Sequence, residues 1–93
     1  MKITGAQITA ARNLLKITQE ELAQASGVAE HTLYRFETDK TLPHQRTLNK
    51  ILAELERRGI EFTNGTGIGV RLNFEKAAEF ARSAAPARHE SDR

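Results

Sequence analysis

Residues Gln19–Glu37 read QEELAQASGVAEHTLYRFE, and this stretch decides the fold. Its apolar residues are spaced as in two short helices that meet at Gly27, a residue that accepts the positive φ of a tight turn. Two helices held at a fixed crossing angle need apolar anchors, a small residue where they cross and a plug at the corner. The residues that meet these needs are Leu22, Ala23, Gly27, Val28, Leu33 and Phe36. The stretch therefore predicts two packed helices joined by a tight turn.

The boundaries of these two helices are also marked in the sequence. Thr18 and Glu21 have the spacing of a capping box, in which the Thr18 hydroxyl accepts from the Glu21 amide and the Glu21 carboxylate accepts from the Thr18 amide. We expect the first helix of the pair to end at about Ser26. The second is expected to run from about residue 29 or 30 to residue 37.

Two further helices are expected on either side of this pair. Apolar residues recur at helical spacing between Ile3 and Ile17, and again from about His44 to Arg58, with a polar loop at residues 38–43. The residues expected to face the core are Ile8, Ala11, Leu14 and Leu15 in the first helix and Leu48, Ile51, Leu52 and Leu55 in the fourth.

The pattern of the chain changes after Gly59. Residues 60–63 and 70–74 alternate apolar and polar, as half-buried strands do, and a glycine-rich loop lies between them. Residues 75–83 favour a helix, Pro86 must end it, and the last residues have the composition of a disordered tail. We therefore expect three segments: a helical domain at 1–59, a short β segment at 60–74 and a partly helical to disordered tail at 75–93.

The run Gln19–Glu37 resembles the helix-turn-helix of phage repressors and Cro, the xenobiotic-response-element (XRE) family of transcriptional regulators, and the resemblance extends over residues 7–58. It implies an all-α fold: a repressor-like DNA-binding bundle of four to five helices, followed here by a short C-terminal β-strand pair or hairpin. It also implies a sequence-specific transcriptional regulator, most often a repressor, that binds double-stranded DNA in the cytoplasm.

In this family the third helix is the recognition helix, which enters the major groove. By position, the resemblance implies base contacts for Glu30, His31, Thr32 and Arg35. It implies phosphate contacts for Gln19, Lys40, His44 and Arg46. It further implies a structural ion pair between Arg12 and Glu37, which would tie the first helix to the end of the recognition helix.

Two residues depart from the family pattern. Ala29 stands where Ser or Thr usually caps the recognition helix, so a capping bond of about 1 kcal/mol is missing. Glu30 stands where a neutral or basic residue is more usual. A carboxylate there is favoured by the helix dipole and can accept from a cytosine amino group, but it repels phosphates.

The sequence also suggests how two copies associate. One recognition helix reads only a few base pairs, so specificity usually comes from two half-sites of a palindromic operator that a homodimer contacts together. We expect the β segment to form the dimer interface through Ile60, Phe62, Val70, Leu72 and Phe74. A hairpin folded back on its own helices is the alternative.

Composition excludes several other classes of protein. With 93 residues, 28% of them charged, and a net charge of +2, the chain is one small domain and only weakly basic. It has no cysteine, its three histidines lack the spacing of metal ligands, and its glycine loop is not followed by the Lys and Ser/Thr of a phosphate loop. No apolar run approaches the length of a membrane span. We therefore expect no enzymatic activity, no cofactor and no metal.

Two other binding functions stay open at this level. The same helical bundle can bind a protein in place of DNA. The chain can also be an antitoxin or adaptor that binds DNA with its helices and a toxin-like partner protein with its C-terminal segment.

Overall fold

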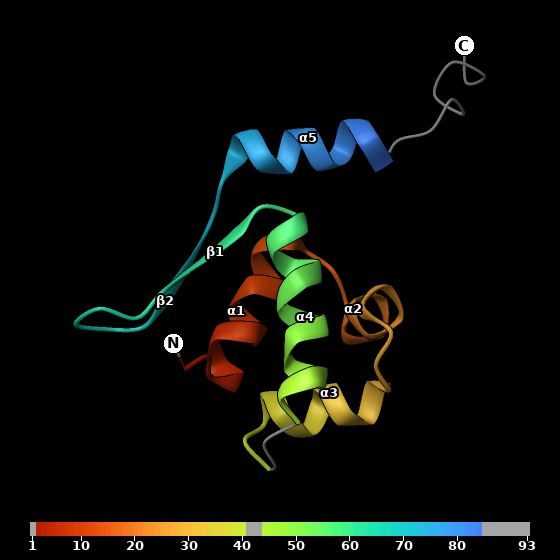
Figure 1. Cartoon of the computed structure of the whole chain (residues 1–93), viewed down its shortest axis with the longest axis vertical. Helices are drawn as coiled ribbons and strands as arrows, with labels where there is room; N and C mark the ends of the chain where they lie inside the picture. The colour runs from red at the N-terminus through yellow and green to blue at the C-terminus, as the bar shows by residue number, and fades with distance from the viewer. Residues whose placement is uncertain (1, 41–43, 85–93) are drawn as a thin grey trace.

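A computed structural model of the chain describes residues 2–40 and 44–84. Figure 1 shows a helical bundle, a hairpin beside it and a further helix across one end. The elements in chain order are α1 (Gly5–Leu15), α2 (Gln19–Ser26), α3 (Glu30–Glu37), α4 (Gln45–Arg57), β1 (Ile60–Thr63), β2 (Gly69–Leu72) and α5 (Phe74–Ala84). The predicted fold, a helical bundle with a C-terminal strand pair, is confirmed.

The helix ends follow from local hydrogen bonds. Thr18 and Glu21 form the predicted capping box at the start of α2, and Thr4 and Gln7 form a second one at the start of α1. Gly27 ends α2 with φ of 76°, a left-handed conformation that a side chain disfavours. By contrast, Ala29 gives α3 no side-chain cap, as the sequence indicates.

The core lies where the first four helices meet. Leu22, Leu33, Ile51 and Leu55 are fully buried there, together with Phe36. The other buried members of this apolar cluster are Ile3, Ile8, Ala11, Ala23 and Ile60. Because Ile60 belongs to the same cluster, the core continues past the predicted boundary at residue 59.

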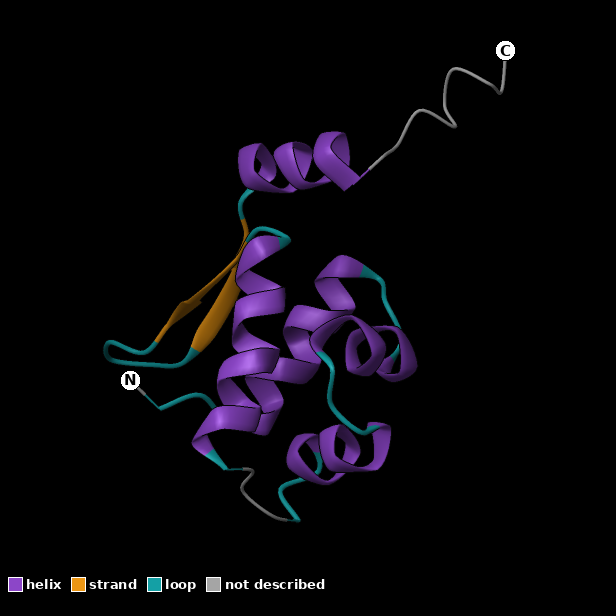
Figure 2. Ribbon diagram, turned by 45° about the vertical axis from the view of Figure 1, so that its right-hand side comes forward, coloured by secondary structure: helices purple, strands orange, loops and turns teal. Residues whose placement is uncertain are grey.

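The two strands form an antiparallel hairpin within the chain. Ile60 lies opposite Leu72 and Phe62 opposite Val70, so four apolar side chains share one face. This face packs on the helices, with β2 against α1 and β1 against α4 (Figure 2). The amide of the buried Gln7 donates to the carbonyls of Thr63 and Gly69 at 3.2 and 3.1 Å. The hairpin therefore folds back on its own bundle.

Two details of the sequence analysis are wrong. Leu14 is 43% exposed, because the buried positions of α1 fall in its first two turns. Phe74 is not in the second strand but is the first residue of α5. The cause is Asn73, whose side-chain oxygen accepts from the backbone amide of Lys76 at 3.0 Å and so caps a new helix.

Parts of the chain named in the sequence analysis lie outside the described residues. They are residues 41–43 of the polar loop and the tail from residue 85, including Pro86. No helix in the described ranges is long and apolar enough to cross a membrane.

Candidate nucleic-acid interface

Helix α3 presents one continuous face to solvent. Leu33, Phe36 and Glu37 are buried on its inner side. Four residues at helical spacing, Glu30, His31, Tyr34 and Arg35, are exposed on its outer side, and Thr32 is half-buried at the edge. Figure 1 shows α3 at one end of the molecule, with no other labelled element beyond it. The fold thus leaves this row of side chains open to a ligand as long as the helix.

The start of α4 lies at the same end of the molecule as α3 (Figure 1). His44 is the N-terminal neighbour of α4, makes no side-chain capping bond and is exposed, as is Arg46. The free backbone amides of a helix N-terminus attract anions such as phosphate. Lys40 is exposed just after α3, and its backbone amide donates to the Arg35 carbonyl at 2.8 Å. Cationic side chains and a helix N-terminus therefore flank the exposed face of α3.

A buried carboxylate holds α3 in place. Glu37 accepts from Arg12 at 2.9 Å through both of its oxygens, and its side chain is only 3% exposed. It also accepts from the Thr9 hydroxyl at 2.9 Å and from the Gln19 amide at 3.0 Å. The Arg12–Glu37 ion pair is thus present and joins α1 to the C-terminal end of α3. The hydrogen bond from Gln19 adds α2 to the same network.

These hydrogen bonds set the charge state of the pair. Burial acts to raise the pKa of Glu37, but hydrogen bonds from Arg12, Gln19 and Thr9 outweigh it, and the pKa is lowered. The hydrogen bond to Glu37 raises the pKa of Arg12. The sequence did not predict that Thr9 and Gln19 donate hydrogen bonds to Glu37, because Glu37 lies 28 residues from Thr9 and 18 residues from Gln19.

Gln19 connects this network to the exposed face. Its side chain is half-buried and lines a shallow hollow that is completed by Glu30, His31 and Tyr34. Because its amide is already bonded to Glu37, its orientation is fixed before any ligand binds. Gln19, which is predicted to contact phosphate, therefore meets Glu30 and His31, which are predicted to contact bases, at this hollow.

The five residues predicted to form the dimer interface lie in different environments. Ile60 is 1% exposed, and Phe62, Val70 and Leu72 are half-buried against the same core. Phe74 alone faces solvent, with an exposed fraction of 81%. The apolar face of the hairpin is therefore occupied by the chain's own helices, and Phe74 is the one of the five that stands clear of them.

Comparison with known proteins agrees with this geometry. A family model described as Helix-turn-helix matches residues 8–62, which include α2, the turn, α3, α4 and all of β1 except its last residue. No curated protein matches the chain. Among the described residues, no group of three His, Cys, Asp or Glu side chains is placed to hold a metal ion.

Proposed function

This chain belongs to the XRE-type, Cro-like helix-turn-helix family of DNA-binding regulators, and from that premise we propose that it represses transcription as a dimer on a palindromic operator. The observation that carries the proposal is the exposed face of α3, held rigidly by Glu37 while its outer side chains stay free. A helix whose position is already fixed loses little backbone entropy on binding, which favours readout of particular bases.

We assign the base contacts to the outer side chains of α3. Arg35 is exposed in the last turn, and its guanidinium has the geometry to donate to O6 and N7 of guanine. Glu30 is exposed in the first turn and can accept from the amino group of cytosine. His31 lies beside Glu30 at the hollow that Gln19 and Tyr34 complete, and Thr32 lies at the edge of the exposed face of α3. Both can reach neighbouring base edges.

We assign the phosphate contacts to the residues around α3. Lys40, His44 and Arg46 are exposed and flank the helix, so they can contact the DNA backbone on either side of the groove. Gln19 adds the N-terminus of α2 to this set. These contacts position the protein on DNA without reading its sequence.

Selection of bound sites from random DNA tests the proposal with the full chain. We expect an enriched palindrome whose half-sites lie one helical turn apart, about 34–36 Å. The matched control is the Arg35→Ala chain, which should lose the preference at one base position in each half-site. Absence of any enriched site would overturn the proposal and favour the adaptor function, in which the C-terminal segment binds a partner protein.

A reporter assay tests the direction of regulation. When the enriched site overlaps a promoter, the protein should lower transcription, because bound protein excludes the polymerase from the same DNA. A rise in transcription from the same promoter would show an activator and overturn this part of the proposal.

A further inference from the structure

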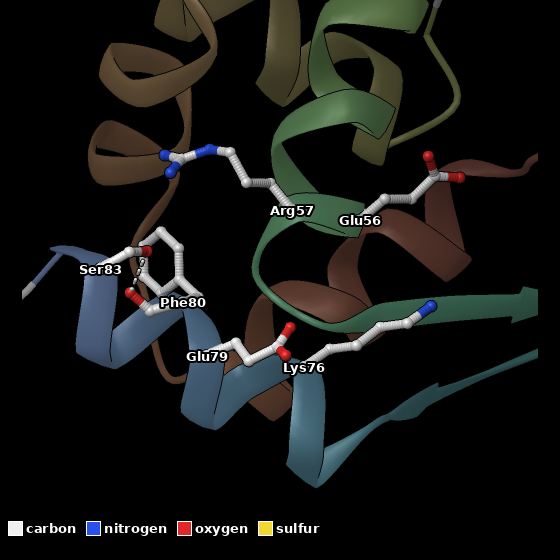
Figure 3. A pocket seen from close by; sticks show the side chains of 6 residues that line it. All are labelled: Glu56, Arg57, Lys76, Glu79, Phe80 and Ser83. Carbon is white, nitrogen blue, oxygen red and sulfur yellow. Dashed lines mark hydrogen bonds between the residues drawn. The ribbon is translucent and has the colours of Figure 1, made fainter.

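Two hollows of the surface, each beside an aromatic side chain, differ in what they can bind. Figure 3 shows the groove between α4 and α5, which is lined by Glu56, Arg57, Lys76, Glu79, Phe80 and Ser83. Its two acidic and two basic side chains cancel in charge. The Phe80 ring is already covered, because the guanidinium carbons of Arg57 and Arg58 each lie 4.8 Å from its centroid. This groove therefore favours no particular ligand.

The hollow on the exposed face of α3 is different. It is lined by Gln19, Glu30, His31 and Tyr34. Tyr34 is 49% exposed, and no cation lies over its ring within the described residues. Glu30 is exposed and takes part in no ion pair among residues 2–40 and 44–84. An aromatic ring and an unpaired carboxylate thus stand in one hollow, and both are open to a ligand.

These two side chains are placed to contact the same base. Glu30 and Tyr34 are four residues apart in α3, so they are neighbours on one side of the helix with Cβ atoms about 5–6 Å apart. Gln19 closes the hollow from α2, and its amide is held by Glu37 at 3.0 Å. In a helix that enters the major groove, this hollow faces the base edges. This step rests on the proposed function, which places α3 in that groove.

The base edges in the major groove decide which base suits the hollow. Cytosine presents an amino group from which Glu30 can accept, but it has no methyl group beside it. Thymine has the methyl group, but its O4 is an acceptor and repels a carboxylate. 5-Methylcytosine carries the amino group and the methyl group on neighbouring ring atoms. Of these three bases, only 5-methylcytosine offers a partner to both the carboxylate and the ring.

We propose that Glu30 and Tyr34 together read 5-methylcytosine, so that the chain binds its operator more tightly when one cytosine in each half-site is methylated. Glu30 accepts a hydrogen bond from the amino group, and the methyl group packs in the hollow against the Tyr34 ring. Tyr34 is thereby a specificity-determining residue, although it is not among the DNA contacts predicted from the sequence. Its hydroxyl takes no part in the contact with the methyl group.

The expected size of the effect follows from the chemistry of the two contacts. Removal of one methyl group from water strengthens binding about fourfold. We therefore expect methylation to raise the affinity about fourfold for each half-site. Thymine at the same position should bind at least about tenfold more weakly than 5-methylcytosine, because the carboxylate then loses its hydrogen-bond donor.

Binding to three duplexes tests the proposal with the full chain. Selection from random DNA supplies the operator, and the same selection with Glu30→Ala identifies the position at which the preference for cytosine is lost. Duplexes with cytosine, 5-methylcytosine or thymine at that position are then compared by titration. The wild type should bind the 5-methylcytosine duplex most tightly and the thymine duplex most weakly. Equal or weaker binding of 5-methylcytosine relative to cytosine would overturn the proposal, as would a Glu30→Ala chain with an unchanged preference for cytosine.

Two substitutions of Tyr34 separate the role of the ring from that of the hydroxyl. Tyr34→Phe keeps the ring and should keep the about fourfold preference for the methylated duplex, whereas Tyr34→Ala should bind both duplexes equally. Because the two affinities are compared within each variant, a change in the folded fraction cancels. The matched control is Phe74→Ala, which removes another exposed aromatic ring, outside the hollow, and should leave the preference unchanged. Loss of the preference in Tyr34→Phe would show that the hydroxyl makes the contact and would overturn the assignment to the ring.

The outcomes distinguish this proposal from the proposed function. If selection enriches a site but the wild type does not distinguish cytosine from 5-methylcytosine in it, the methyl readout fails and the proposed function stands. If selection enriches no site, the proposed function fails and the methyl readout fails with it.

Discussion

Arg35 and Lys40 lie five residues apart at one end of the molecule, yet their expected roles on DNA differ. Arg35 is on the outer face of α3, whereas Lys40 is exposed just after the helix, where we expect it to contact only the backbone of the DNA. A side chain that contacts a base edge adds specificity, and one that contacts a phosphate adds affinity for any sequence. The two residues therefore form a matched pair for testing the orientation of α3.

We predict that Arg35→Ala weakens binding to the operator by about 1–3 kcal/mol and relaxes the preference at one base position. Lys40→Ala should weaken binding to all sequences about equally and reduce the slope of log affinity against log salt by about one unit. Titrations with operator and random DNA at several salt concentrations measure both effects. If the two variants lose the same affinity on both kinds of DNA, α3 does not read bases through Arg35.

Glu37 is the residue on which the position of α3 depends. Its pKa is lower in the folded chain than the ordinary value of 4.5. At pH values between these two pKa values, the carboxyl group is therefore protonated more in the unfolded chain than in the folded chain. The contribution of Glu37 to stability is therefore complete above about pH 4.5 and is lost as the pH falls through the folded pKa. Glu54 has a lowered pKa for the same reason and adds to the acid dependence.

We predict that Glu37→Gln lowers the free energy of unfolding at pH 7 by at least about 2 kcal/mol, because Arg12 loses its charged partner. The variant should also show a shallower fall in stability below pH 4.5 than the wild type. Urea unfolding at a series of pH values measures both. Glu20→Gln, at an exposed position of α2, is the matched control and should follow the wild type. Parallel pH curves for Glu37→Gln and the wild type would contradict this account.

At the scale of elements, α3 is the helix with the weakest N-terminal capping among the first three. Ala29 has an extended backbone, φ −71° and ψ 142°, which is the conformation of a capping residue, but it lacks an oxygen to accept from the helix amides. The first turn of the recognition helix is therefore held by Leu33 and the turn before it, with no capping bond of its own.

We predict that Ala29→Ser stabilises the chain by about 1 kcal/mol and raises the melting temperature by about 4–8 °C. Ala29 is exposed and the backbone already has the required conformation, so the serine displaces nothing. Ala29→Val is the control, because it adds a side chain without an acceptor and should give no gain. Thermal unfolding followed by circular dichroism measures the change, and equal melting temperatures for Ser and Val would show that no capping bond forms.

At the scale of the whole molecule, the hairpin belongs to the bundle and α5 does not. Every buried apolar residue of the core precedes Asn73, and Ile60 is one of them. The hairpin also covers the bundle with three half-buried side chains, Phe62, Val70 and Leu72. Helix α5 adds the contact of Phe80 with two arginines and an ion pair between Lys76 and Glu61.

We predict that a chain ending at Asn73 stays folded and still binds a single half-site. A chain ending at Arg58 should unfold or be strongly destabilised, because the loss of Ile60 alone costs about 2–5 kcal/mol of a total of about 5–15. Circular dichroism and urea unfolding of the two truncated chains make the comparison. A stable chain ending at Arg58 would show that the helices form an independent domain at residues 1–59.

The helix pair at the centre of the fold follows from local signals in the amino-acid sequence. Its signals are local: the Thr18 capping box, the turn at Gly27 and the apolar spacing that buries Leu33 and Phe36 each act within a few residues. The Arg12–Glu37 pair was also predicted, but only through the resemblance to a known family. Short-range periodicity and capping are therefore enough to fix α2, α3 and the residues that α3 exposes.

The way in which distant segments meet depends on tertiary contacts. The alternation of residues 60–63 shows that one face is buried but not by what, and the packing of Ile60 on its own bundle answers that. A Cβ atom on Gly5 would collide with the Phe36 carbonyl oxygen, so α1 approaches α3 closely at a place that no local pattern reveals. Both depend on contacts between residues far apart in sequence, which local propensity does not determine. The start of α5 at Phe74 is different, because the Asn73 cap is a local hydrogen bond from the Lys76 amide that the alternating pattern of residues 70–74 concealed.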